Sequence, residues 1–197
     1  MTTYSVEVVY RGVFQRTLSR NICRGIVLAA RKEGKLGTAF SRYSDSPERN
    51  GIPAKYFAVV ADEALELEDI LAMYQPTEVD VTICLDDTLC KGMESWGWDG
   101  LNPVNAVTKE GGTLLITTRQ TSETLLEDIH RKDVPYNMAL VTGPASFSGL
   151  WVYKDDHTDV RILGALAQVC PGLVSLDSYC EAIVDQWNSV TKVTSAR

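Results

Sequence analysis

The sequence predicts a single α/β domain with a mostly parallel sheet flanked by helices. Three observations support this prediction. The length of 197 residues suits one domain, 45% of the residues are hydrophobic, and β-rich apolar runs alternate with helical patterns of ten or more residues. We expect the domain to cover residues 1–188, followed by a polar tail, residues 189–197, whose polar composition predicts fraying.

The first predicted strand and the first predicted helix are separated by a loop. Residues 4–9 alternate in polarity and are rich in Val and Tyr, a pattern typical of a strand. Residues 11–16 are predicted to form the loop. Helical spacing of apolar residues begins after it, with Thr17 or Ser19 as the N-cap, and the helix is expected to end near residue 35.

The alternation of strands and helices continues to the end of the chain. Further strands, rich in β-branched and aromatic residues, are predicted at residues 38–40, 56–60, 79–85, 113–118 and 138–142. Further helices are predicted at residues 62–74, 121–131 and 160–169, and from Ser175 or Asp177 to about residue 187. The sequence Glu-Gly-Gly at residues 110–112 predicts a turn.

Composition and charge exclude several classes of protein. Nineteen Lys and Arg stand against 26 Asp and Glu, so no basic surface for nucleic acid is indicated. Residues 1–9 lack the pattern of a signal peptide, and the longest apolar tract, residues 162–176, is too short and too interrupted to span a bilayer. We therefore expect a cytoplasmic protein that contacts neither nucleic acid nor membrane.

The cysteines favour no metal or redox site. No two of them are spaced C-x-x-C, so the usual patterns of zinc, redox-pair and iron–sulfur sites are missing. We expect reduced and mostly buried thiols at Cys23, Cys84, Cys90, Cys170 and Cys180.

In a doubly wound α/β protein, the loop after the first strand is the usual place for a bound phosphate. That task needs glycines, because backbone N–H groups must approach the ligand at the helix N-terminus. Gly12 is the one glycine here, and Val13 and Phe14 follow it. Gln15 and Arg16 complete a degenerate loop in which arginine can attract an anion by charge alone. We expect Phe14 to pack inward or against a partner, and the loop to bind no nucleotide.

Two other loops carry candidate functional residues. Asp86 and Asp87 follow a central strand, at the edge of the sheet where ligands bind, and capping the next helix is favoured over ligand binding. Trp96 and Trp98 lie between glycines, and tryptophan is enriched at interface hot spots. A small hydrophobic cluster beneath the loop is an equal alternative.

Several short motifs occur in a characteristic order. They are Y-R-G-V-F-Q-R at residues 10–16, R-K-E-G-K at 31–35, S-P-E-R-N-G-I-P at 46–53, D-V-T-I-C-L-D at 80–86, E-G-G-T-L-L-I-T at 110–117, L-G-A-L at 163–166 and V-S-L-D-S-Y-C-E-A-I at 174–183. In this order they resemble the gamma subunit (domain III) of pyruvate and related 2-oxoacid:ferredoxin oxidoreductases. Gly12 and Gln15 match that family's G-x-G-G-Q-G loop, whereas Val13, Phe14 and Arg16 replace glycines.

The resemblance implies an assembly subunit without a catalytic centre of its own. Such complexes oxidatively decarboxylate a 2-oxoacid such as pyruvate or 2-oxoglutarate to an acyl-CoA, or run the reverse carboxylation, exchanging electrons with ferredoxin. Thiamine diphosphate, Mg²⁺, [4Fe–4S] clusters and CoA are then expected on the alpha, beta and delta subunits. We expect contacts with those subunits at Arg49, Asn50 and Gly51 and at Trp96 and Trp98. The alternative is a free-standing α/β module that binds a small anionic ligand.

Overall fold

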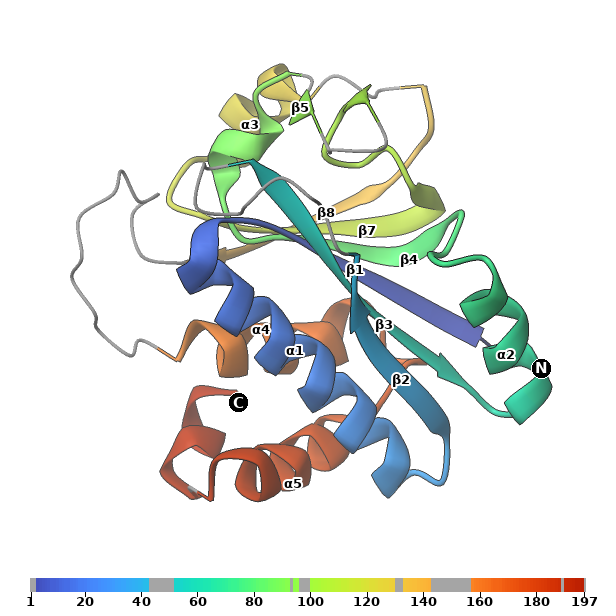
Figure 1. Cartoon of the computed structure of the whole chain (residues 1–197). Coiled ribbons are helices and arrows are strands. Elements are labelled where there is room, and N and C mark those ends of the chain that lie inside the picture. Colours follow the sequence, from blue (N-terminus) through green and yellow to red (C-terminus); the bar gives the residue numbers. More distant parts are fainter. Residues whose placement is uncertain are drawn as a thin grey trace.

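One six-stranded sheet runs through the molecule, with the strand order β2-β3-β1-β4-β7-β8 (Figure 1). This computed structural model describes residues 3–42, 52–92, 94–95, 100–129, 133–142, 157–188 and 190–196. The strands are β1 (Thr3–Arg11), β2 (Leu36–Ser41), β3 (Pro53–Ala61), β4 (Val79–Cys84), β7 (Thr108–Thr118) and β8 (Asn137–Thr142). A small hairpin pairs β5 (Glu94–Ser95) with β6 (Leu101–Asn102).

The helices alternate with these strands, and all five predicted helices are present. They are α1 (Gly12–Lys32), α2 (Ala64–Ala72), α3 (Ser122–Asp128), α4 (Thr158–Val169) and α5 (Leu176–Trp187). Two 3₁₀-helices, η2 (Asp87–Cys90) and η4 (Val190–Ser195), complete the described secondary structure.

Strand β1 lies at the centre and joins two kinds of pairing. It pairs parallel with β4, and β4 with β7 and β7 with β8 are parallel as well. On its other side β1 pairs antiparallel with β3, which in turn pairs antiparallel with β2. Residues 42–52 are too short a connection for the crossover that a parallel pair needs, so β3 runs against the other five strands. The predicted α/β class with a mostly parallel sheet is confirmed.

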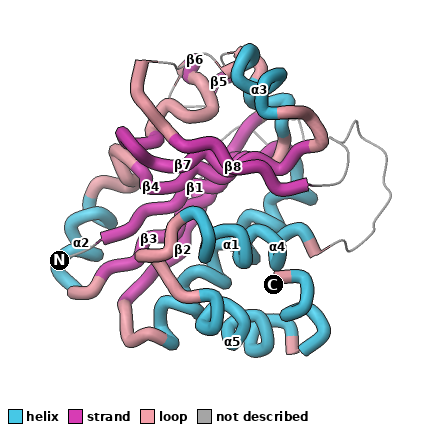
Figure 2. The backbone as a smooth tube through the Cα atoms, turned by 180° about the vertical axis from the view of Figure 1, so that it is seen from behind, coloured by secondary structure: helices cyan, strands magenta, loops and turns pink. Residues whose placement is uncertain are grey.

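Helices cover both faces of the sheet (Figures 1 and 2). Helices α1, α4 and α5 form one layer, and α3 with η2 lies over the opposite face. Neighbouring residues of β1 therefore point into different cores. Val8 packs into the larger core with Ile22 of α1 and Leu163 of α4, whereas Val9 packs into the smaller one with Leu125 of α3. Burial on both faces explains why the strands are continuously apolar in sequence.

A buried ion pair crosses the face of the sheet opposite α1. Glu7 of β1 is fully buried, and its Oε2 lies 3.2 Å from Nζ of Lys55 on β3. The Thr82 hydroxyl of β4 donates to Oε1 of Glu7 at 3.0 Å. A buried carboxylate is tolerated when a cation and hydrogen-bond donors surround it, and these three strands supply them.

Helix α1 begins earlier than the sequence pattern predicts. It starts at Gly12, directly after β1, so the predicted loop at residues 11–16 is wrong. Gly12 has φ +80°, a left-handed conformation that allows the abrupt change from strand to helix. Ser19 caps no helix end, because its hydroxyl donates to the carbonyl of Gln15 one turn earlier, inside α1.

The turn predicted at residues 110–112 is a bulge inside β7. Val79 pairs with Thr108 and Val81 with Thr113, so the strand register between β4 and β7 is interrupted at the intervening residues. Gly111 has φ +71°, which explains the glycine. A glycine pair signals a break in regular backbone, and the sequence alone does not say whether that break is a turn or a bulge.

The C-terminal residues pack against the helical layer instead of fraying. Residues 190–195 form η4, and Ala196 is buried beside α4. Gly164 of α4 allows this contact, because a Cβ at that position would lie 1.8 Å from the carbonyl oxygen of Ala196. The expectation of a frayed tail is therefore wrong for residues 190–196. Val193 and Ala196 pack against the larger core, and η4 contacts α4 and α5, which are contacts that exist only in the folded chain.

We predict that Gly164→Ala lowers the free energy of unfolding by about 1–3 kcal/mol, the usual cost of overpacking. The added methyl group meets backbone atoms of Ala196, which cannot rotate away. Chemical denaturation of the full chain and of a chain ending at residue 188 checks this. The substitution should cost clearly less in the shortened chain, and an equal cost in both would contradict the packing of Ala196 on Gly164.

Candidate functional site

The candidate site lies at the carboxyl ends of β1 and β4. From β1 the chain passes through α1 to β2, at one edge of the sheet. From β4 it passes to β7, which lies in the opposite direction along the order of strands. In open α/β sheets the place where the direction reverses is the usual ligand crevice. The structure brings Gly12, Gln15, Asp86 and Asp87 to this edge, as the sequence predicts for residues that follow parallel strands.

Gln15 ties the ends of the two central strands together. Its Oε1 accepts a hydrogen bond from the backbone N–H of Arg11 at 2.7 Å, and its Nε2 donates to the carbonyl of Leu85 at 3.4 Å. Gly12 has no atom within 4 Å of where a Cβ would be, so its backbone conformation and not lack of space calls for glycine. Gly12 and Gln15 thus position α1 on the sheet.

The first turn of α1 presents apolar side chains to solvent. Val13 is 53% exposed and Phe14 is 47% exposed. The expected inward packing of Phe14 is therefore wrong, and contact with a partner stays a prediction. A diphosphate at a helix N-terminus needs close approach to backbone N–H groups, which glycines would permit and these larger residues hinder.

Asp86 and Asp87 hold the chain after β4. The Asp86 carboxylate accepts from the backbone N–H of Thr88 at 3.0 Å and from its hydroxyl at 2.6 Å, so Asp86 is the N-cap of η2 and the favoured capping role is confirmed. Asp87 is buried, and its Oδ2 accepts from the Thr118 hydroxyl at 2.6 Å and from the Gln120 amide at 3.1 Å. Asp86 thus fixes the start of η2, and Asp87 connects the chain after β4 to the end of β7.

The cysteines do not fit an iron–sulfur cluster. Four of the five are buried, as expected, and Cys84 at the end of β4 is a neighbour of Cys90 at the end of η2. A hydrogen bond with Cys90 and burial both raise the pKa of the Cys84 thiol, and burial raises the pKa of Cys23. Cluster ligation needs thiolates. Within the described part of the chain, no three His, Cys, Asp or Glu side chains are arranged to hold a metal ion.

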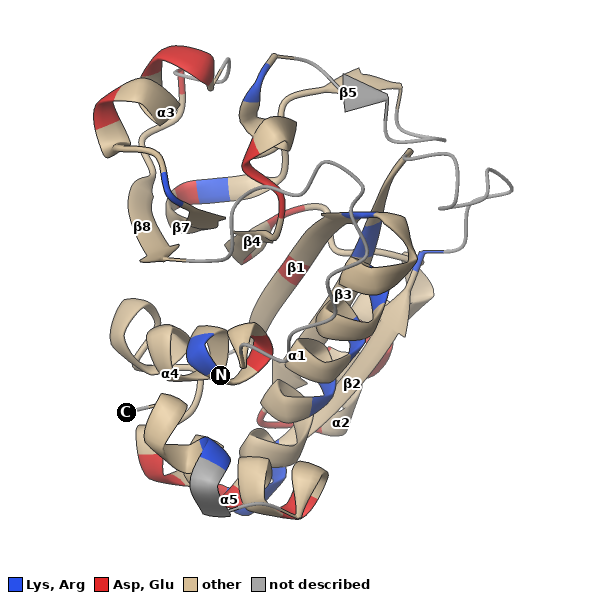
Figure 3. Cartoon of the chain, turned by 90° about the vertical axis from the view of Figure 1, so that its left-hand side faces the viewer, with Lys and Arg blue, Asp and Glu red and all other residues tan. Residues whose placement is uncertain are grey.

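Helix α1 carries a basic face in an acidic protein. It contains no Asp or Glu, and Arg16, Arg20 and Arg24 are exposed along it (Figure 3). Burial raises the pKa of the Tyr56 hydroxyl on β3, and the guanidinium groups of all three arginines act in the opposite direction. The positive charges of the three arginines thus favour the ionised form of this hydroxyl. The loop pattern in the sequence pointed to Arg16. It gave no sign that these arginines would affect Tyr56, because that effect depends on where β3 pairs in the sheet.

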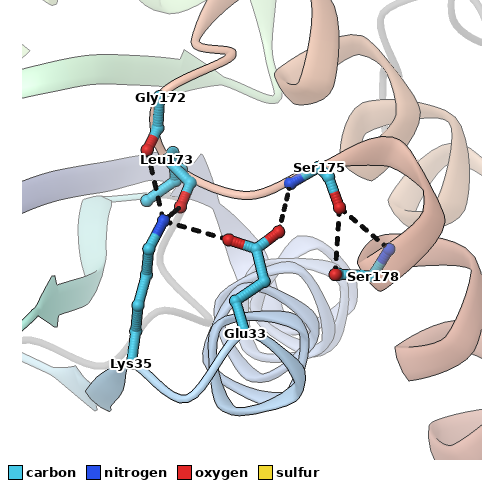
Figure 4. A network of polar contacts seen from close by, with 6 residues as sticks. All are labelled: Glu33, Lys35, Gly172, Leu173, Ser175 and Ser178. Carbon is cyan, nitrogen blue, oxygen red and sulfur yellow. Dashed lines mark hydrogen bonds and ion pairs between the residues drawn. The ribbon is translucent and has the colours of Figure 1, made fainter.

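The E-G-K motif fixes the other end of α1 (Figure 4). Gly34 has φ +75°, and its N–H donates to Arg31 while the N–H of Lys35 donates to Ala30, which is a Schellman C-cap. The Lys35 ammonium group donates to the carbonyl of Leu173 at 2.7 Å and forms an ion pair with Glu33 at 3.0 Å.

Glu33 binds the connection between α4 and α5. Its Oε1 accepts from the backbone N–H of Ser175 at 2.7 Å, and the Ser175 side chain caps α5 (Figure 4). Partial burial favours the protonated carboxyl, but hydrogen bonds from Ser175, Lys35 and Ser178 outweigh it and lower the pKa of Glu33 to about 2. The sequence pattern identified the motif and missed this role, since Ser175 is 142 residues away.

The predicted interface residues lie outside the part of the chain that the structure describes. They are Arg49, Asn50, Gly51, Trp96 and Trp98. In sequence the first three stand between β2 and β3, and the tryptophans stand between β5 and β6. Their contact with partner subunits remains a prediction.

Known proteins resemble this chain over most of its length, although no family model matches it. The common gamma subunit of the pyruvate/ketoisovalerate oxidoreductases of Thermococcus litoralis is 32% identical over 160 residues, which are 81% of this chain and 75% of that protein. The chain belongs to this gamma-subunit family. The corresponding subunit of Thermococcus kodakarensis is 31% identical over 169 residues, which are 86% of this chain and 80% of that protein.

Solved structures share the fold of this gamma-subunit family member. Pyruvate oxidoreductase subunit PORC of Thermotoga maritima superposes with a TM-score of 0.65 at 18% identity, over 100% of this chain and 93% of that one. The gamma subunit of a keto/oxoacid ferredoxin oxidoreductase of Geobacter sulfurreducens gives 0.63 at 19% identity, with the same coverage. A 2-oxoglutarate:ferredoxin oxidoreductase of Magnetococcus marinus gives 0.56 at 12% identity over all of this chain and 29% of that one.

None of the described helices of this gamma-subunit family member is long and apolar enough to cross a membrane.

We predict that Glu33→Gln lowers the free energy of unfolding at pH 7 by about 1.5–3 kcal/mol, the range for hydrogen bonds to a charged group. The folded-state pKa of about 2 lies below the ordinary value of 4.5, so this stabilisation is present above pH 4.5 and is lost as the pH falls toward 2. Urea unfolding of both proteins between pH 7 and pH 2 checks this. The difference should shrink in that window, while Glu127→Gln on an exposed face of α3 should change little at any pH.

Proposed function

We propose that this chain is the gamma subunit of a multisubunit 2-oxoacid:ferredoxin oxidoreductase and serves assembly without a catalytic centre of its own. The observation that carries the proposal is membership of the gamma-subunit family together with the order of its motifs along the whole fold. On this proposal the domain extends over residues 1–188, and its partners are the alpha, beta and delta subunits.

The complex would convert a 2-oxoacid and CoA into an acyl-CoA and CO₂, with two electrons passing to ferredoxin, or catalyse the reverse carboxylation. Thiamine diphosphate with Mg²⁺, the [4Fe–4S] clusters and CoA would be bound by the partner subunits. Among the described residues, no three His, Cys, Asp or Glu side chains could hold a metal ion, which supports placing the clusters on the partner subunits.

The polar groups at the carboxyl edge support an assembly role. Gln15, Asp86 and Asp87 each hydrogen-bond to groups within the chain, and those bonds join β1, β4 and β7. A general base must instead reach the proton of a substrate. The described polar residues of this edge therefore stabilise the positions of α1 and the neighbouring loops for contact with other subunits.

A free-standing module that binds a small anion is the second candidate. The observation in its favour is the row of exposed arginines Arg16, Arg20 and Arg24 on α1, a helix that contains no Asp or Glu. Calorimetric titration of the isolated chain with NAD, FAD, ATP and CoA distinguishes the two. Micromolar binding that is lost on Arg16→Ala would favour this second function, and absence of binding would favour the assembly role.

We predict that the chain, tagged at its own locus, co-purifies with larger alpha, beta and delta-type chains. Mass spectrometry of the native complex gives their stoichiometry. The complex should reduce ferredoxin in a reaction that requires a 2-oxoacid and CoA, whereas the isolated chain should contain no iron and show no decarboxylation. Stoichiometric acid-labile sulfide in the isolated chain, or purification of the chain alone, would refute the proposal.

We further predict that replacing both Trp96 and Trp98 by Ala weakens assembly and leaves the chain folded. Large aromatic residues between glycines favour a contact surface. Competition between tagged wild-type and variant chains for incorporation into the complex measures the effect, and thermal unfolding verifies the fold. Equal incorporation would show that the two tryptophans make no contribution to the interface.

A further inference from the structure

Helix α2 packs only loosely on the rest of the molecule. It follows β3 and precedes β4, and none of its residues is buried. Figure 1 shows it beside the N-terminus, at one end of the sheet and apart from the helices of both layers. Ala61, just before α2, pairs with Thr3 at the start of β1, so the start of α2 lies at the end of the sheet opposite the carboxyl edge.

Large apolar side chains are exposed on and around this helix. They are Leu36 (41% exposed), Leu65 (72%), Leu71 (41%), Met73 (50%) and Tyr74 (89%), which we call the α2 patch. They are five of the ten large hydrophobic side chains exposed among the described residues. Leu36 belongs to the patch because it pairs with Ala61, at the start of the connection to α2. Concentration of exposed apolar residues at one place is typical of an interaction site.

Tyr74 is the member of the patch that the fold explains least. It follows Met73, the C-cap of α2, and has φ +64°. Glycine is the usual residue at this position after a helix, because a side chain is strained in the left-handed conformation. The chain has a tyrosine there, and its side chain is almost fully exposed. Neither the helix end nor the core gains from this ring.

The exposed charges on α2 and in the two residues before it have one sign. Asp62, Glu63, Glu68 and Asp69 are exposed, and residues 62–74 contain no Lys or Arg. Two copies of the patch placed face to face would bring these carboxylates together, which like-charge repulsion disfavours. An apolar centre with an acidic border instead complements an apolar surface bordered by basic residues.

We propose that the α2 patch docks on a non-identical subunit of the oxidoreductase complex, on an apolar surface bordered by Lys and Arg. This inference rests on the proposed function and adds to it a specific contact surface. The patch lies at the opposite end of the sheet from the residues that follow β1 and β4. Docking through it therefore leaves the carboxyl edge accessible to another part of the complex.

The decisive variant is Leu65→Ser combined with Tyr74→Gly. Tyr74→Gly removes the ring and relieves the positive φ, so the isolated chain should unfold at the same or a higher temperature. Assembly should nevertheless fall. When tagged variant and wild-type chains are co-expressed at equal levels with the partner subunits, the purified complex should contain at least tenfold less variant. The matched control is Leu126→Ser, which removes a 47% exposed leucine from α3 and should be incorporated like the wild type.

A photo-crosslinking residue at position 74 then identifies the contact. Cross-linking to a partner subunit at a segment that contains Lys or Arg supports the proposal. Cross-linking to a second copy of this chain, or equal incorporation of the double variant and the wild type, overturns it. Loss of incorporation with Leu126→Ser as great as with the double variant also overturns it. Failure of the wild-type chain to join any complex would overturn the proposed function as well, so the two failures are distinguishable.

Discussion

The fold depends on how α1 is held between the sheet and the other helices. At its start, Gly12 lets the helix follow β1 without a loop, and Gln15 binds the chain after β4. At its end, Glu33 and Lys35 bind the connection between α4 and α5. Between these points Gly25 lies so close to Leu163 of α4 that a Cβ would come within 2.6 Å of a methyl carbon. The helix is thus fixed at both ends and closely packed in the middle.

This placement of α1 determines what the carboxyl edge can do. The side chains that a ligand-binding sheet would offer to substrate here connect strands to one another. The first turn of α1 exposes Val13 and Phe14 where glycines would leave the backbone open. The basic face along α1 and the apolar, acid-bordered α2 patch leave the molecule with two surfaces of opposite charge at different places. Such a distribution suits a chain that contacts more than one neighbour.

The exposed groups of this protein therefore say more about its contacts with other chains than the buried groups do. The buried ion pair of Glu7 and Lys55 and the buried carboxylate of Asp87 have their partners inside the chain. An unpaired buried charge would destabilise the fold, and these internal pairs are consistent with a rigid scaffold. By contrast, the side chains of Tyr74 and Leu65 stay largely exposed in the isolated fold, and burial against another chain would stabilise both.

The sequence by itself determined the class of fold, the order of strands and helices, and the family resemblance. Apolar periodicity and β-branched runs act locally, so residues 56–60, 79–85 and 113–118 were recognisable as strands without any partner. The capping role of Asp86 was predictable for the same reason, because the N–H that it accepts is two residues away.

Tertiary structure decided the features that depend on residues far apart in the chain. The start of α1 at Gly12, the bulge at residues 110–112 and the packing of Ala196 on Gly164 all contradict the local pattern. Each is stabilised by contacts across the fold that outweigh a local preference. The partners of Glu33 and the exposure of the α2 patch were likewise invisible in sequence, since they are set by which elements the sheet brings together and which it leaves uncovered.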